Sequence, residues 1–393
     1  MHCIIVATVI NRKDENMAEK INKPRVVWLD LLRVFASCMV PLTHLCSNCW
    51  NLVEVRSADF VAMNFYSAMC RWIVPVFVMI SGAFFLNPSK PCDPKKIFTK
   101  NVVRMATAFL FWSFLYALQW TLFRPHAQNA TVQPFSKKFF LNELIIGEYH
   151  MWYLYMIALL YLITPLIRVF TDNATKKQME AFMVLSFVFV NVIPMILKIP
   201  FFKQFTFSDV YGYLNIGYIG GFTGVYVGGQ YMVRYPFRKK IRYMIYALGV
   251  LGYLITVFGN LWISYVKNDT VKDFLVVNLG CCVMIAYAMF TLFQHEFSKI
   301  QFKEKTVKKI QWLSARSFGV YLCHVFVMRA FQYFGIQIIH ISPKHATVDM
   351  SFMPFIKIPA IIGAPVLWIL VVIGSFLVSW GVSKIPKISK YIS

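Results

Sequence analysis

Long apolar runs alternate with short polar connections along almost the whole chain. A helix needs about 20 apolar residues to cross the hydrocarbon core of a bilayer. The runs that approach or exceed that length lie near residues 26–47, 60–86, 99–123, 151–171, 178–198, 211–233, 241–266, 271–294, 312–334 and 359–386. The pattern predicts an all-α fold, a polytopic membrane helix bundle over residues 26–386 with about ten transmembrane helices. An N-terminal extension without regular structure (1–25) and a short tail (387–393) flank it.

Composition and charge sharpen this picture. The chain is 58% hydrophobic and 15% charged, which is too apolar for a soluble domain. Its net charge of +23 comes from Lys and Arg clustered between the apolar runs rather than on one basic face, so we expect no nucleic-acid partner. The connections on the N-terminal side hold 26 of these residues and the opposite connections hold 10. The positive-inside rule then predicts that both termini are cytoplasmic.

Other features limit where chemistry can take place. The nine cysteines lack paired metal-ligand spacing, so we predict neither a metal site nor a disulfide framework. The longest outer connections, 124–150 and 335–358, are too short for a folded domain. Near the N-terminus, Met17 competes with Met1 as the translation start, because the apolar stretch before it is too short to span. Any chemistry is therefore expected inside the bundle or at its two ends.

The first predicted span carries a polar stripe. At about 100° per residue, Arg33 and His44 point in nearly the same direction, and Asp30 and Ser37 lie within about 60° of it. Ionisable groups inside a membrane are costly and commonly functional, and Asp30 and Arg33 can offset part of that cost by pairing. The alternative interpretation is a structural ion pair and a packing histidine. His44 lies about 16 Å from Arg33 along the helix, so these residues cannot act on one atom.

The residues of this stripe match a known motif. LDLLRVFASCMVPLTH (29–44) resembles the first-helix signature of the membrane acyltransferase-3 family, whose members move acyl groups from a cytoplasmic thioester to cell-surface glycans. Further stretches agree with the family in the same order: VPVFVMISGAFF (74–85), KKIFTKNVVRM (95–105), HMWYLYMIALLYLITPLI (150–167) and SARSFGVYLCH (314–324). The resemblance puts the family's first-helix histidine at His44 and its arginine at Arg33.

The resemblance also implies a donor, acyl-CoA with acetyl-CoA foremost, and no tightly bound cofactor. In the family, two arginines three positions apart at the start of the third helix serve the donor. Here the pair reads Asn101 and Arg104, with Lys100 adjacent. Arg104 keeps the match, and Lys100 replaces the first arginine only as a point charge. Positive-inside charge is the alternative explanation of this basic cluster.

Three further residues are candidates. His150 begins the fourth span at the depth predicted for His44. Two interpretations stay open: a cavity shared with His44, in which the two divide the base and orienting roles, and an ordinary position in the interfacial aromatic belt. Ser81 and His324 are candidate substrate-binding residues, although close helix packing at Ser81–Gly82 and a packing role for His324 are the simpler interpretations. Arg71 and Arg316 are placed at span edges, where long side chains snorkel.

The resemblance, together with these patterns, implies an O-acyltransferase of the bacterial cytoplasmic membrane with Asp30, Arg33, His44 and His150 as catalytic candidates. Its expected partners are the acyl-CoA donor, an envelope saccharide or lipid-linked glycan acceptor, the lipid bilayer and glycan-synthesis proteins. A transporter or exporter of glycan intermediates is the alternative, since a polar stripe also suits a permeation path. An inactive scaffold partner is a third possibility.

Overall fold

The computed structural model describes residues 26–50, 53–123, 137–203, 211, 221–333, 336–342, 345–350, 357–386 and 389–392. In this part of the chain, long apolar helices form a bundle, which confirms the predicted all-α membrane fold class. Seven of its helical segments are long and apolar enough to cross a bilayer. The number of ten spans and the cytoplasmic termini stay predictions, and the N-terminal extension (1–25) lies outside the described residues.

The elements follow the predicted runs with some shifts. The N-terminal half contains α2 (Val27–Cys49), α3 (Ala58–Met69), α4 (Ile73–Phe85), α5 (Pro94–Lys96), a π-helix (Ile97–Val102), α6 (Val103–Phe123), α7 (Lys137–Ile146), a 3-10 turn (Tyr149–Met151), α8 (Trp152–Asn173), α9 (Lys176–Ser186), a second π-helix (Phe187–Val192), α10 (Ile193–Ile196) and α11 (Pro200–Lys203). The remainder contains α14 (Thr223–Arg234), α15 (Lys239–Lys267), α16 (Gly280–His295), a 3-10 turn (Phe297–Lys299), α17 (Glu304–Tyr333), β1 (Ile336–Ser342), β2 (His345–Met350), β3 (Lys357–Pro359), α18 (Ala360–Val382) and α19 (Ser389–Ile392).

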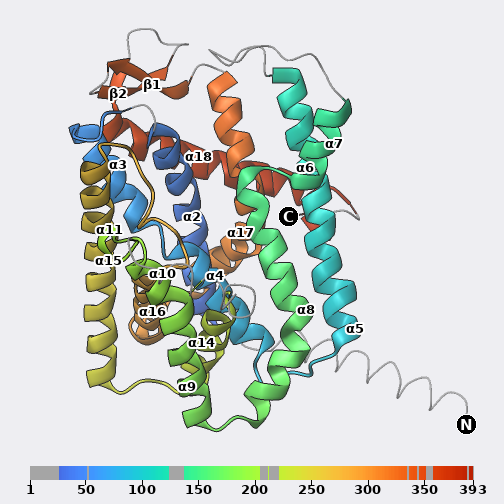
Figure 1. The fold of residues 1–393 in the computed structure, drawn as a ribbon. Coiled ribbons are helices and arrows are strands. Elements are labelled where there is room, and N and C mark those ends of the chain that lie inside the picture. The colour runs from blue at the N-terminus through green and yellow to red at the C-terminus, as the bar shows by residue number, and fades with distance from the viewer. Residues whose placement is uncertain are drawn as a thin grey trace, which may run out of the picture.

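The two ends of the bundle carry different connections. The sheet strands β1 and β2 lie at the same end as α7, whereas α5 and the connection between α8 and α9 lie at the other (Figure 1). The strands form one antiparallel sheet in the order β1-β2-β3 within the connection expected at 335–358. The two longest predicted outer connections therefore share one end, as the alternation of basic residues requires.

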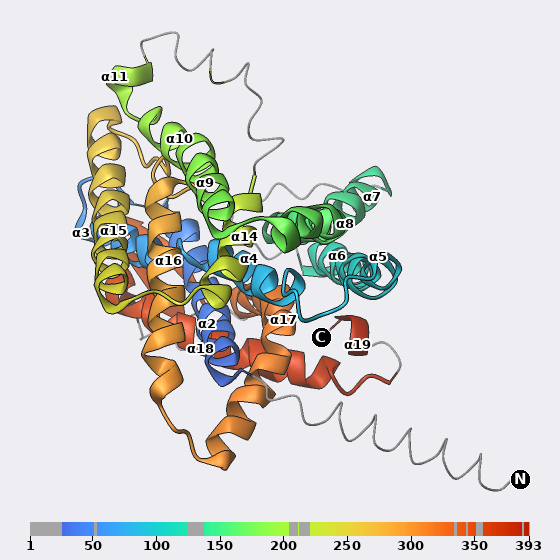
Figure 2. The ribbon, with the colours of Figure 1, turned by 90° about the horizontal axis from the view of Figure 1, so that it is seen from below.

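The first helix occupies the middle of the bundle. α2 packs against α17, α18, α3, α4 and α16, and it lies between α15 and α6 in both views (Figures 1 and 2). Leu32, Ala36 and Cys46 are fully buried. A helix enclosed in this way holds its polar side chains against other helices rather than against lipid.

The second predicted span, 60–86, is two helices rather than one. α3 ends at Met69 and α4 begins at Ile73, with Arg71 in the break. Pro75 accounts for the break, because it lacks the N–H that would bond to the Arg71 carbonyl four residues earlier. Arg71 is only 8% exposed. Its predicted position at a span edge is therefore wrong, and the break puts a buried cation in the middle of this segment.

Close backbone contact joins α4 to α14. A Cβ atom built on Gly82 would lie 1.8 Å from the Tyr226 carbonyl oxygen, and one on Gly229 would lie 2.0 Å from that of Met79. Only glycine permits this approach from either side. The interpretation of Ser81–Gly82 as a packing site is thus supported at Gly82, and the contact fixes the position of Ser81 on α4.

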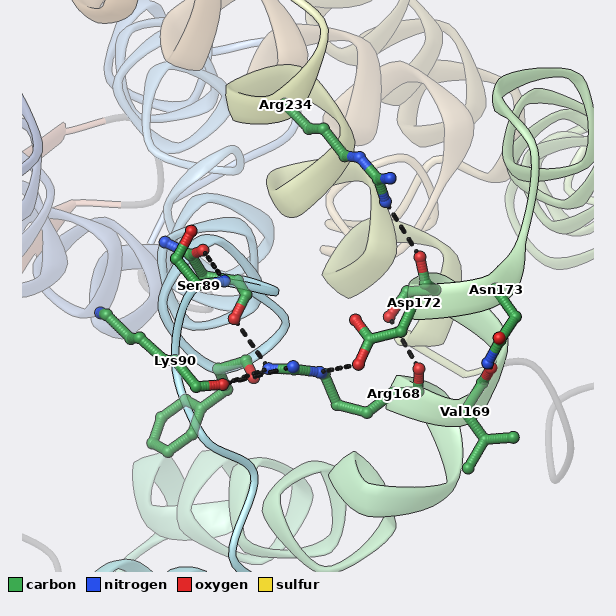
Figure 3. Close-up of polar contacts among 10 residues, drawn as sticks. Ser89, Lys90, Arg168, Val169, Asp172, Asn173 and Arg234 are labelled. Carbon is green, nitrogen blue, oxygen red and sulfur yellow. Dashed lines mark hydrogen bonds and ion pairs between the residues drawn. The ribbon is translucent and has the colours of Figure 1, made fainter.

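A buried arginine fixes the connection after α4 (Figure 3). Arg168 of α8 donates to the carbonyl oxygens of Asn87 at 2.8 Å and Lys90 at 3.3 Å, and it pairs with Asp172 at 2.9 Å. It also donates to the Phe85 carbonyl at 3.3 Å, which is one of the unsatisfied acceptors at the end of α4. The segment that leads to α5 and the third span is therefore tied to α8.

Candidate active site

The polar stripe of α2 lies inside the bundle. Asp30 and Ser37 are buried, and Arg33 and His44 are partly buried. Phe35, on another face of the helix, is 40% exposed. The stripe therefore faces other protein elements, and two separate clusters form along it.

The first cluster surrounds the start of α2. Arg33 Nη1 lies 3.4 Å from Asp30 Oδ1, in the predicted ion pair. Ser314 of α17 donates its hydroxyl to Asp30 Oδ1 at 2.6 Å and accepts from Arg33 Nη1 at 3.2 Å. These partners offset the desolvation of a buried carboxylate. No sequence pattern paired Ser314 with Asp30, because the two are 284 positions apart in the chain.

Arg104 of α6 lies near this ion pair. Its guanidinium carbon is 5.1 Å from the Phe318 ring centroid. The charges of Arg104 and Arg33 act on each other, and both act on the Tyr161 phenol. Lys100, on the π-helix that precedes α6, is exposed. The structure therefore brings two of the predicted arginines together and leaves Lys100 outside the bundle.

Three imidazoles form the second cluster, toward the other end of α2. The ring centroid of His44 is 5.0 Å from that of His324 on α17 and 6.2 Å from that of His150. The rings of His150 and His324 are 4.7 Å apart. His150 and His324 are buried, whereas His44 is partly accessible. The described residues contain no metal-binding group of His, Cys, Asp and Glu, and these rings are not one.

His324 has a defined tautomer. Its Nδ1 lies 2.7 Å from the backbone oxygen of Tyr321, and because a carbonyl only accepts, Nδ1 carries the hydrogen. Nε2 of the neutral ring is then a lone-pair acceptor, and it is buried without a hydrogen-bond partner among the described residues. The His150 nitrogens have no such partner either, although the Leu322 carbonyl lies near that ring. The cluster therefore holds unused proton-accepting capacity.

Aromatic side chains enclose the three imidazoles. The Tyr321 hydroxyl donates to the His150 carbonyl at 2.7 Å. The Tyr116 ring lies 5.5 Å from the His150 ring. Tyr149 is 51% exposed, and its ring centroid is 5.2 Å from that of His44. His44 is thus the member of the cluster that faces an accessible aromatic surface.

A line of aromatic rings connects the two clusters. Tyr321 lies 6.5 Å from Phe318 on the arginine side and 5.6 Å from His150 on the histidine side, between ring centroids. Tyr153 is 5.4 Å from Tyr321. Ser81 interacts with the Tyr153 phenol and with that of Tyr161. The two predicted substrate-binding residues therefore lie in different places. Ser81 lies along this line of rings, and His324 belongs to the histidine cluster.

One ion pair beside the histidines was missed from the sequence. Arg329 Nη1 lies 2.6 Å from Glu148 Oε2, and the Arg329 guanidinium lies 4.1 Å from the centroid of the Trp120 ring. Glu148 is two positions from His150 and buried. The available signal was an arginine inside the apolar run 312–334, because such a charge requires a partner.

One protein family matches almost the whole chain. Residues 26–384 match a family whose description is acyltransferase domain (Acyl_transf_3). The chain belongs to the acyltransferase-3 family. No curated protein and no solved structure matches it. The motif resemblance is confirmed, and the protein is an acyltransferase with several apolar helices suited to a membrane.

The matched range of this acyltransferase includes both clusters and the aromatic line. Within it, His44, His150 and His324 lie together, and Arg33 and Arg104 are electrostatic neighbours at a second position. Asp30 and Arg33 do not reach the imidazoles, because Arg33 lies eleven residues of helix from His44, about 16 Å, and Asp30 lies one turn further away. Asp30 and Arg33 share a helix face with His44, but the three cannot act on the same substrate atom. A common catalytic role for all three is therefore not supported by their positions.

Proposed function

We propose that this acyltransferase moves an acetyl group from acetyl-CoA to a hydroxyl of a cell-envelope saccharide or lipid-linked glycan. The observation that carries the proposal is the meeting of three imidazoles from separate parts of the chain, joined by aromatic rings to a pair of arginines. We place the enzyme in the bacterial cytoplasmic membrane with both termini in the cytoplasm.

The arginine end suits the donor. Arg104 would hold phosphate oxygens of CoA, since a guanidinium offers paired donors to such groups. Lys100 is exposed at the same end and would add only a point charge. The pantetheine arm would then follow the rings of Phe318 and Tyr321 toward the histidines. Arg33 and Asp30 would shape the entrance of this path.

The histidine end suits the transfer step. A sugar hydroxyl is a weak nucleophile, so a base must remove its proton as the oxygen attacks the thioester carbonyl. His44 is our candidate base because it is the accessible member of the cluster. The tetrahedral intermediate expels the CoA thiolate, and the imidazolium of His44 returns the proton to that sulfur. The products are the sugar ester and free CoA, and His150 and His324 orient His44.

A two-step route uses the same residues. His44 would first take the acetyl group from the thioester and then pass it to the hydroxyl. A labelled acetyl-protein that is trapped in wild type and lost in His44→Ala favours this route over direct transfer.

The test uses purified protein in vesicles, labelled acetyl-CoA and an envelope glycan extract from cells that lack the gene. Wild type should release CoA in proportion to labelled glycan. His44→Gln should lower transfer by about 10²- to 10⁴-fold, the usual contribution of a general base. His295→Gln is the matched control, because His295 ends α16 and lies outside the cluster. Full activity in a correctly inserted His44→Gln protein would contradict the proposal.

An exporter of glycan intermediates remains the second candidate because of one observation. The break between α3 and α4 gives the discontinuous helix that transporters often use. The same vesicles separate the two functions. Movement of glycan across the membrane without CoA release supports export, and CoA release that requires glycan supports transfer.

A further inference from the structure

The break between α3 and α4 holds a cation that the transfer step does not use. Arg71 is 8% exposed and donates to the Ser67 hydroxyl, while its Nε has no hydrogen-bond partner among the described residues. Its electrostatic neighbours Cys46, Cys70 and Cys282 are thiols. A buried guanidinium without a carboxylate is costly, and such groups are normally paired.

A second cation lies close to the first. Lys272, in the connection between α15 and α16, has its ammonium 5.9 Å from the Trp50 ring centroid at the end of α2. Partial burial of its ammonium group and the nearby Arg71 charge lower the pKa of Lys272, although the residue as a whole is exposed. Asp273 follows it directly but pairs with Lys198 and Lys267 instead. Among the described residues, neither Arg71 nor Lys272 has an ion-pair partner.

Both cations are electrostatic neighbours of the proposed base. The charges of Arg71 and Lys272 act on the His44 ring. On α2, Thr43 interacts with the Cys70 thiol, which places the break at the depth of His44. Lys272 is exposed, whereas Arg71 is buried, so the pair extends from the accessible surface toward the imidazole. An anion that entered from this side would meet the lysine first and the arginine next.

We propose that Arg71 and Lys272 form an anion subsite for the acceptor, which therefore carries a phosphate or carboxylate group near the hydroxyl that is acylated. This inference rests on the proposed function and adds the chemical class of the acceptor. Guanidinium and ammonium groups both donate to such oxygens, and Arg71 has unused donor capacity. The competing outcome of the test is that Arg71 instead stabilises the oxyanion that forms during the reaction.

The first experiment divides the envelope glycan extract into neutral and anionic fractions by ion exchange. Wild type should transfer labelled acetyl to the anionic fraction. Phosphatase treatment abolishes transfer if the group is a phosphate monoester, and amidation with a carbodiimide abolishes it if the group is a carboxylate. Transfer confined to the neutral fraction would overturn the subsite, whereas no transfer to either fraction contradicts the proposed function itself.

Variants test the residues. Arg71→Gln and Lys272→Gln should raise the KM for the anionic acceptor about 10- to 100-fold, the range of one or two charge-assisted hydrogen bonds, and leave the KM for acetyl-CoA unchanged. Arg56→Gln is the matched control, because Arg56 is exposed and lies 6.0 Å from the Tyr265 ring centroid. A fall in kcat at constant KM in Arg71→Gln would assign the oxyanion role and overturn the subsite.

A binding measurement makes the test independent of turnover. With CoA saturating the donor side, glucose 1-phosphate or glucuronate should raise the melting temperature of wild type, and glucose should not. Lys272→Gln lies on an exposed connection, so it keeps the test valid if Arg71→Gln fails to fold. Equal shifts in wild type and Lys272→Gln would contradict the participation of the lysine.

Discussion

His324 is held in one orientation by the helix turn that carries it. The Tyr321 carbonyl accepts from its Nδ1, and the Tyr321 hydroxyl donates to the His150 backbone. One tyrosine thus positions two of the three histidines. The buried Nε2 of His324 faces no other donor among the described residues, so it is free to act on a neighbouring imidazole or on substrate.

Substitutions that remove one or both ring nitrogens of His324 should have different effects. His324→Asn keeps a donor at the Nδ1 position and removes the Nε2 acceptor, so we expect near-normal thermal stability with transfer reduced about 10²-fold or more. His324→Phe removes both and leaves the Tyr321 carbonyl without this partner, which should cost about 1–3 kcal/mol of stability. Melting temperature and labelled acetyl transfer measure the two effects. Equal loss of stability in both variants would assign His324 a packing role.

Sequence reasoning reached this cluster only in part. The periodicity of α2 and the start of the fourth run put His44 and His150 at one depth, which local spacing can predict. Ser314 beside Asp30 and Arg329 beside Glu148 arise from contacts between distant helices. Such partners depend on how helices pack, and hydropathy along one chain does not contain that information.

At the scale of elements, the approach of α4 to α14 sets the position of Ser81 and of the proposed substrate path. Gly82 and Gly229 bring the two backbones together, and the residue before Gly82 is Ser81, which interacts with the tyrosines between the clusters. Displacing α4 would therefore move Ser81 relative to Tyr153. We therefore expect stability and acyl transfer to be coupled through this contact.

Gly82→Ala should show this coupling. The new methyl group would lie 1.8 Å from the Tyr226 carbonyl oxygen, which is backbone and cannot rotate away. We expect a loss of about 1–3 kcal/mol, the range for overpacked sites, together with reduced transfer. Gly381→Ala is the control, because nothing lies within 4 Å of its added Cβ. Unchanged melting temperature in Gly82→Ala, measured in the same detergent, would contradict the close contact.

The break in the second span had a sequence signal that the hydropathy of the run concealed. Residues 60–86 are apolar over most of their length, so hydropathy alone predicts one helix there. Pro75 nevertheless removes the hydrogen bond to the Arg71 carbonyl, and a proline inside a helix commonly kinks or ends it. An arginine four residues before a proline in an apolar run is therefore better read as a buried group at a break than as an edge residue.

At the scale of the whole molecule, one end gathers the arginine cluster and the other gathers the histidines. Long apolar runs predicted the bundle, because twenty apolar residues have few other stable arrangements. The small sheet was not predicted, since the 335–358 segment was read as a connection. Its β-branched residues, as in IQIIHIS, were the available indication of strands. The proposed direction of transfer requires the arginine end to face the cytoplasm.

Single cysteines introduced into a variant without the nine native ones should report this orientation. Ser89 and Ser298 are exposed in connections predicted to be cytoplasmic, and Glu54 and Asp269 are exposed in connections predicted to be outside. An impermeant maleimide should therefore label Glu54→Cys and Asp269→Cys in intact cells, and label Ser89→Cys and Ser298→Cys only after the membrane is opened. Labelling of all four in opened cells is the control. Reaction of Ser89→Cys in intact cells would show that the bundle is inserted in the opposite orientation. Arg104 would then face the outer side of the membrane, where acetyl-CoA is absent.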